Sequence, residues 1–127
     1  MTKFERLFSQ LPESIDCALI TSDINRRYFT GMKSSDGTVI AFRDGAYLII
    51  DFRYIEKARA TVTSAEVIEQ KKLYVQLNEL IREHKASKVA IESQTLTVSR
   101  LHIMQAQLKD VEVIDTDVLS NAINALR

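Results

Sequence analysis

The sequence predicts an α/β domain with a mixed β-sheet of about five or six strands and helices on both faces. Three observations support this. Short apolar runs alternate with stripes of apolar residues at helical spacing along the whole chain, which is typical of helices packed on a sheet. An Asp-Gly pair between two apolar runs predicts one antiparallel hairpin. The 127 residues, 46% apolar and 27% charged, match a single ordinary globular domain.

The first helix is predicted from apolar residues that recur at helical spacing, at positions 4, 7, 8 and 11. Pro12 ends this helix because a proline cannot continue it. An apolar strand over residues 17–21 follows. A second helix then runs to residue 29, with Ser22 or Asp23 as its N-cap and Gly31 as its C-terminal residue.

The hairpin is expected to pair a strand over residues 38–42 with a strand over residues 46–50. Its turn is Arg43-Asp44-Gly45, and a tight Asp-Gly turn of this kind needs positive φ at both turn positions. Both strands are almost continuously apolar, so we expect other elements to cover them on both faces.

The second half of the chain alternates helices with short strands. Helices are predicted over residues 54–62, 73–81, 98–108 and 118–126, and strands over residues 66–68, 88–91 and 111–114. Asp115, Thr116 or Asp117 is expected to cap the last helix. Asp110 and Glu112 should face solvent, because side chains alternate along a strand.

The charge balance excludes some classes of partner. The 17 basic and 17 acidic residues cancel, which argues against a nucleic-acid or anionic-membrane binder. Short basic pairs such as Arg26-Arg27 and Lys71-Lys72 are interpreted as solvated surface. No apolar run approaches the ~18 residues that span a bilayer, and the first residues are not signal-like. We therefore expect a cytoplasmic protein.

Catalytic chemistry is not evident in the sequence. A zinc or dinuclear-metal site needs several convergent His, Cys or carboxylate ligands, and the only histidines are His84 and His102. Both are interpreted as structural or exposed, and His84 is expected in the last turn of a helix. The single cysteine, Cys17, lies in an apolar run and is expected to be a buried, reduced thiol. No catalytic and no metal-binding residue is assigned.

Two segments, Asn25–Met32 and Ile49–Ala58, are less generic. A helix that ends in Tyr-aromatic-Thr-Gly leads through a polar loop and a hairpin to Asp-x-Arg-Tyr at the start of another helix. This order resembles the N-terminal domain of the creatinase, prolidase and aminopeptidase P family, whose members are Xaa-Pro dipeptidases and aminopeptidases. The resemblance implies a creatinase N-terminal-domain-like fold with a ribonuclease H-like motif, covering residues 1–127 as one domain.

The resemblance extends to Val89–Glu92 and to the predicted helix over residues 98–108 that follows in the sequence. The segment Ile123–Arg127 also resembles the linker helix before the family's catalytic domain. It implies that this pita-bread domain, absent from this chain, should follow. Two Asp, one His and two Glu of that domain would bind a divalent metal pair (Mn, Co or Zn). The implied partners are this C-terminal catalytic domain, a second copy in a homodimer, and short proline-containing peptides.

The loop from Lys33 to Asp36 is the best candidate for substrate contact, because polar loops on a rigid strand framework often carry recognition. Arg53 is expected to be a neighbour of the loop. In the resembled family this region faces the mouth of the catalytic site, often that of a dimer partner. Lys33, Asp36 and Arg53 are therefore assigned as substrate-gating residues; an alternative is that they are only solvated loop positions.

Structural interpretations also exist for the residues of the two segments. Tyr28 and Phe29 are consistent with core positions beneath the sheet. Asp51 is consistent either with a cap for the helix that follows it or with a substrate contact.

The resemblance thus implies an accessory domain of a cytoplasmic Xaa-Pro metallopeptidase, which gates substrate access, supports dimerisation and is not catalytic alone. A catalytically inactive relative that serves as a peptide- or protein-binding module is the main alternative. A freestanding small enzyme of unrelated chemistry is a further alternative, disfavoured by the missing catalytic constellations.

Overall fold

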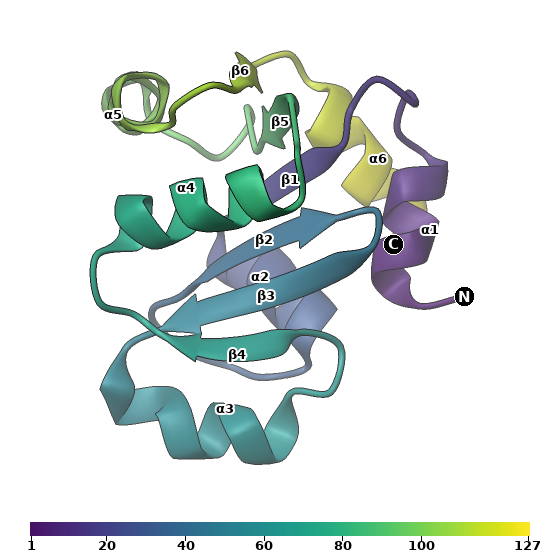
Figure 1. Ribbon diagram of the computed structural model, residues 1–127. Coiled ribbons are helices and arrows are strands. Elements are labelled where there is room, and N and C mark those ends of the chain that lie inside the picture. Colours follow the sequence, from purple (N-terminus) through teal and green to yellow (C-terminus); the bar gives the residue numbers. More distant parts are fainter.

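A computed structural model describes all 127 residues and confirms the mixed α/β sheet with helices on both faces (Figure 1). The strands are β1 (Cys17–Ile20), β2 (Thr38–Phe42), β3 (Gly45–Ile50), β4 (Glu66–Glu69), β5 (Lys88–Ile91) and β6 (Glu112–Ile114). The helices are α1 (Lys3–Ser9), α2 (Asp23–Thr30), α3 (Ile55–Thr61), α4 (Leu73–Glu83), α5 (Val98–Gln107) and α6 (Val118–Leu126), and a 3₁₀ helix, η1, spans Phe52–Tyr54.

The six strands lie in the order β4-β3-β2-β1-β5-β6, and only β2 runs against the others. Five strands therefore end at the same edge of the sheet, where β2 begins. We call it the carboxyl edge. Thr21, Asp51 and Glu92 directly follow β1, β3 and β5 at this edge. The topology thus gathers polar loop residues that are far apart in the sequence, as is usual at the carboxyl ends of α/β sheets.

Alternating side chains of the sheet feed two cores. In β1, Ala18 and Ile20 pack with residues of α1, α2, α3 and α6 on one face. Cys17 and Leu19 point to the other face and pack with residues of α4 and α5. Each face is thus buried by its own set of helices, which explains why the central strands are nearly continuous apolar runs.

The hairpin lies where the sequence predicts it, but its turn has a different backbone. Phe42 pairs with Gly45, so the loop consists of Arg43 and Asp44 only. Neither Asp44 nor Gly45 has a positive φ, so the prediction for those dihedrals is wrong. Tertiary contacts hold the turn instead: the Arg43 guanidinium donates to three backbone carbonyls near α1, and Asp44 accepts from His84. These contacts override the local preference of the Asp-Gly pair.

The caps predicted for α2 are confirmed, whereas the cap predicted for α6 makes no capping hydrogen bond. Ser22 caps α2 through its Oγ, which accepts from Asn25 N at 3.3 Å, and Gly31 ends the helix with φ +75°. Asp117 occupies the N-cap position of α6, but its carboxylate accepts a hydrogen bond from Ser93 Oγ and makes no capping bond. Ser93, in the loop after β5, therefore binds the Asp117 carboxylate, which would otherwise be free to accept from the backbone N–H groups of α6.

The histidine and cysteine interpretations are confirmed for His84 and Cys17. The ring of His84 stacks on Phe42 with centroids 4.1 Å apart, and its nitrogens lie 2.8 Å from Asp44 Oδ1 and 2.7 Å from the Tyr47 hydroxyl. This histidine thus joins α4 to the hairpin. Cys17 is fully buried, and burial raises the pKa of its thiol. No helix has the length and apolar character needed to cross a membrane.

Candidate functional site

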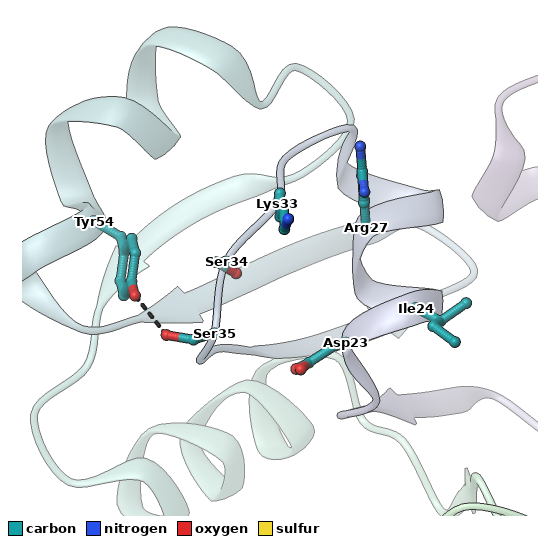
Figure 2. Close-up of a pocket in the computed structure, with 7 residues that line it drawn as sticks. All are labelled: Asp23, Ile24, Arg27, Lys33, Ser34, Ser35 and Tyr54. Atoms are coloured by element: carbon teal, nitrogen blue, oxygen red, sulfur yellow. Dashed lines mark hydrogen bonds between the residues drawn. The ribbon is translucent and has the colours of Figure 1, made fainter.

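The candidate site lies at the carboxyl edge, where three segments meet. They are the start of α2, the loop 33–37 before β2, and the segment 51–54 after β3 (Figure 2). The hydroxyls of Ser35 and Tyr54 are 2.6 Å apart and join the loop to the last of these segments. The polar loop and the Asp-x-Arg-Tyr sequence, which the sequence analysis singled out separately, are therefore parts of one site.

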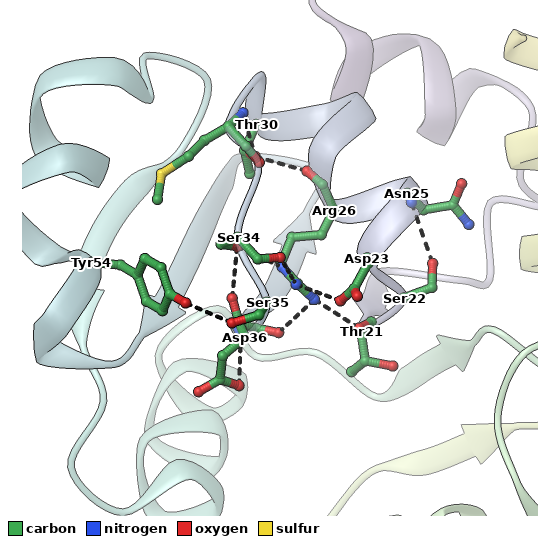
Figure 3. Close-up of polar contacts among 12 residues, drawn as sticks. Thr21, Ser22, Asp23, Asn25, Arg26, Thr30, Ser34, Ser35, Asp36 and Tyr54 are labelled. Atoms are coloured by element: carbon green, nitrogen blue, oxygen red, sulfur yellow. Dashed lines mark hydrogen bonds and ion pairs between the residues drawn. The ribbon is translucent and has the colours of Figure 1, made fainter.

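Arg26 is the central polar residue of the site, and its interpretation as solvated surface was wrong because its side chain is only 2% exposed. Its Nη1 donates to Thr21 O at 2.9 Å and to Gly37 O at 3.2 Å. Its Nη2 donates to Asp23 Oδ1 at 2.7 Å and Ser34 O at 2.8 Å, and its Nε donates to Ser34 Oγ at 3.3 Å (Figure 3). All five N–H donors of the guanidinium are used, so a buried charge is fully hydrogen-bonded.

Gly37 leaves the space that Arg26 occupies. A Cβ at this position would lie 3.1 Å from Arg26 Cδ and 3.2 Å from Arg26 Nε, and the φ of +131° also disfavours any larger residue. The carbonyl of the same glycine accepts a hydrogen bond from the guanidinium. Backbone and side chain therefore fix the loop against α2 together.

Glu92 holds the other side of the α2 N-terminus and is 1% exposed. Its Oε1 accepts from Thr21 N at 2.6 Å and Ser22 N at 2.8 Å. Its Oε2 accepts from Ser22 Oγ at 2.6 Å and Asn25 Nδ2 at 2.7 Å. A carboxylate with four donors next to the positive end of a helix is well stabilised. Arg26 and Glu92 thus fix the framework that carries the loop.

The three assigned gating residues occupy the exposed rim of this framework. Lys33 and Asp36 are exposed loop residues, and the Arg53 side chain is 63% exposed. The Asp36 carboxylate accepts from Gly37 N at 2.8 Å. A hydrogen bond from Arg53 to Asp51 raises the pKa of the guanidinium, and the charge of Asp36 raises it further by a smaller amount. Charges of both signs therefore stand close together at the rim.

Asp51 caps the short helix η1, as one of the two interpretations of this residue predicts. Its Oδ1 accepts from Arg53 N at 2.9 Å and from Arg53 Nε at 3.0 Å. Both hydrogen bonds hold the pKa of this carboxyl below its ordinary value of 3.8. The bond from Arg53 N has the larger effect, and the bond from the Arg53 side chain has the smaller one. Asp51 therefore fixes the position of the Arg53 side chain.

A pocket of about 530 Å³ opens between α2, the loop and Tyr54. It is lined by Asp23, Ile24, Arg27, Lys33, Ser34, Ser35 and Tyr54 (Figure 2). A second hollow of about 340 Å³ lies on the other side of the loop and includes Asp36 and Arg100. Of the three assigned residues, only Lys33 lines the larger pocket, and Arg53 lines neither hollow.

Four residues of the site were not predicted from the sequence to belong to it: Arg26, Arg27, Tyr54 and Glu92. Arginines at 26 and 27 look alike in a basic pair, but the helical turn points one inward and the other outward. The sequence position of Glu92, directly after an apolar strand, was the available signal, because residues at strand carboxyl ends gather at one edge.

Most polar groups at this edge are bound to one another, and two exposed cations remain at the larger pocket. No group of three or more His, Cys, Asp or Glu side chains is arranged to hold a metal ion. The hydroxyls, the carboxylates and the guanidinium of Arg26 are engaged with one another or with backbone groups. Arg27 and Lys33 are the exposed cations that line the larger pocket.

Comparison with known proteins gives consistent matches. The family model of the creatinase/prolidase N-terminal domain matches residues 7–127. The uncharacterized peptidase YqhT of Bacillus subtilis is 32% identical over 115 residues, which are 90% of this chain and 32% of that protein. This chain thus spans about a third of the length of that relative.

Solved structures agree with the family match. The Xaa-Pro dipeptidase from Bacillus anthracis superposes with a TM-score of 0.84 at 30% identity, covering 93% of this chain and 34% of that one. The N-terminal domain of the cytoplasmic peptidase PepQ from Mycobacterium tuberculosis H37Rv superposes with a TM-score of 0.79 at 27% identity, covering 94% of this chain and 96% of that one. An N-terminal domain of this kind therefore forms a folded unit without further chain in the second case.

Proposed function

Because the chain belongs to the creatinase/prolidase N-terminal domain family, we propose that it is the accessory N-terminal domain of a longer, metal-dependent Xaa-Pro dipeptidase or aminopeptidase. Residues 1–127 form its single domain, and a pita-bread catalytic domain follows in the parent protein. The domain gates the access of short proline-containing peptides and supports a homodimer. It is not catalytic alone. The cytoplasmic peptidase among its structural relatives supports a cytoplasmic location.

The observation that carries the proposal is a rigid polar framework with charged residues on its outer rim. Arg26 and Glu92 are buried and fully hydrogen-bonded, and they hold a loop whose outer residues Lys33 and Asp36 are exposed. Fixed loops of this kind present recognition groups to a partner surface without the entropy cost of ordering them on binding. The rim is therefore suited to face the opening of a catalytic site on another domain or subunit.

The metal pair belongs to the catalytic domain in this proposal. No three His, Cys, Asp or Glu side chains gather in this chain, so its residues do not fit a metal pair of manganese, cobalt or zinc. The contribution of this chain is to select which peptides enter. Lys33 and Arg53 offer positive charge and Asp36 offers negative charge, which suits the two ends of a short peptide or a charged side chain.

The test compares the isolated chain with the parent protein on Xaa-Pro peptides, each with and without added manganese, cobalt or zinc. The parent is expected to hydrolyse the peptides and the isolated chain is not. Metal-dependent turnover that copurifies with the isolated chain would contradict the accessory role. A parent that folds and binds metal but hydrolyses no Xaa-Pro peptide would contradict the proposed reaction.

A catalytically inactive binding module is the second candidate. The pocket of about 530 Å³ favours it, because the pocket is complete within this chain and needs no catalytic domain. The sequence that follows Arg127 in the parent discriminates between the two. A set of two Asp, one His and two Glu ligands supports the peptidase, and loss of that set within an otherwise similar domain supports the module.

A further inference from the structure

We propose that the pocket between α2 and the loop binds the C-terminal carboxylate of a short peptide, with Arg27 and Lys33 as its two cationic contacts. The proposal rests on the proposed function for the class of ligand. It adds a residue, Arg27, and a chemical group, the carboxylate, that the gating role alone does not specify.

Two cations of the pocket have no ion-pair partner within the chain. Arg27 and Lys33 line the pocket from different elements, the helix and the loop (Figure 2). Neither takes part in any of the four ion pairs of the chain. The one carboxylate in the lining, Asp23, is already paired with the buried Arg26 at 2.7 Å. The pocket therefore presents two cations whose charge is not neutralised within the chain.

The two cations lie at a concave part of the surface. Two exposed cations on a flat surface would be ordinary solvated charges. Arg27 and Lys33 instead flank a concave space of about 530 Å³. That volume lies in the range of about 300–1,000 Å³ that is typical of small-ligand pockets. A hollow of this size accommodates a dipeptide-sized molecule. The pocket therefore suits a small peptide and not the flat surface of another protein.

An aromatic ring also lines the pocket. The ring of Tyr54 lines the pocket on the segment after β3, whereas the side chain of Ile24 on α2 points away from the loop (Figure 2). The face of the Tyr54 ring suits the ring of a terminal proline, while the guanidinium of Arg27 matches a carboxylate in a two-bond arrangement. The preorganised framework under the pocket keeps both walls in place, because Arg26 bonds α2 to the loop.

The test uses N-acetylglycylproline and its C-terminal amide as probes of the isolated chain. Amide chemical shifts are followed by two-dimensional NMR at low and at high salt. The acid should shift residues 23–35 and 54 in a saturable way, and the uncharged amide should not. Arg27→Gln and Lys33→Gln should each weaken binding of the acid about three- to tenfold, and added salt should weaken it in the wild type. Arg59→Gln removes an exposed cation of α3 and serves as the matched control.

Acetate provides the second probe and separates a peptide subsite from a general anion site. The peptide acid should bind more tightly than acetate, because its proline ring can pack on the Tyr54 ring. Equal affinity for the two, equal shifts from the acid and the amide, or unchanged binding in Arg27→Gln would each overturn the proposal.

The parent protein provides an independent readout. Arg27→Gln should raise KM for Ala-Pro about three- to tenfold and leave KM for its amide unchanged. An unchanged ratio of the two KM values would overturn the role of the pocket in the parent. If the parent hydrolyses no Xaa-Pro peptide at all, the proposed function fails, whereas the NMR titration of the isolated chain still decides on the carboxylate site.

Discussion

Arg26 donates a hydrogen bond to the carbonyl of Gly37 across 3.2 Å, and a Cβ on Gly37 would lie 3.1 Å from Arg26 Cδ. The glycine is thus required both by its own backbone and by its neighbour. This pair fastens the loop 33–37 to α2, and the exposed rim of the site depends on it. A substitution at either residue should disturb the loop more than the sheet.

Gly37→Ala should lower the free energy of unfolding by about 1–3 kcal/mol, because a methyl group meets Arg26 and φ is positive. Gly45→Ala is the matched control. Its Cβ would meet nothing closer than His84 Cε1 at 3.6 Å, and its φ is not positive, so its effect should be near zero. Urea titrations of the three proteins check this. Equal stability of the two variants would contradict the close approach at Gly37.

Arg26→Met should lower the free energy of unfolding by about 3 kcal/mol or more. The carbonyls of Thr21, Ser34 and Gly37 would lose their hydrogen-bond donors, and these groups are largely buried. The neighbouring Arg27→Met should change stability by no more than about 0.5 kcal/mol, since that side chain is exposed. Thermal unfolding and amide hydrogen exchange measure both. If the Arg27 variant were the more destabilised, the assignment of inward and outward arginines would be wrong.

Glu92→Gln should destabilise the domain by about 2–3 kcal/mol. An amide can accept at only one of its two terminal atoms, whereas the carboxylate accepts four hydrogen bonds from Thr21, Ser22 and Asn25. Glu112→Gln, on the exposed part of β6, should be nearly neutral. Denaturant midpoints at constant m-value report the difference. A neutral Glu92→Gln variant would mean that the network does not hold α2.

Much of the fold was predictable from the sequence because its signals are local. The stripe of apolar residues in α4 and the Gly31 end of α2 are each encoded within a few residues, and both are confirmed. The hairpin strands also match, because strand residues and turn residues are adjacent in the sequence. The dihedral angles of the turn were predicted wrongly, since distant carbonyls near α1 hold the Arg43 side chain.

The site was only partly predictable because its contacts join distant segments. The loop 33–36 stood out as polar, and Arg53 follows a recognisable Asp. Burial of Arg26 depends on Gly37 and on the end of β1, and nothing in the basic pair itself distinguishes it from Arg27. The contact of Glu92 with the α2 N-terminus spans about 70 residues of sequence and follows only from the parallel pairing of β1 with β5.

The Asp51 carboxyl should titrate below its ordinary pKa of 3.8, since it accepts bonds from Arg53 N and Nε. A lowered folded-state pKa means that its contribution to stability is present above about pH 3.8 and is lost as pH falls through the lower folded-state value. Carbon-detected NMR of the carboxyl measures the midpoint. Arg53→Ala should raise it only partway, because the backbone donor remains. A wild-type midpoint at or above 3.8 would contradict the cap.

The central claim is that the rim of this domain selects substrates and performs no chemistry. Steady-state kinetics of the parent enzyme with acidic, basic and neutral Xaa-Pro substrates tests it most directly, in wild type, Asp36→Ala and Arg53→Ala. A charge-assisted hydrogen bond of roughly 1.5–3 kcal/mol corresponds to about a tenfold to hundredfold effect on affinity, and screening at an exposed rim lowers it. We expect altered KM or an altered ranking of charged substrates, with kcat within a few-fold for the best substrate. Identical kinetics across all substrates in both variants would reduce these residues to solvated loop positions, and a uniform collapse of kcat with intact folding would contradict the claim outright.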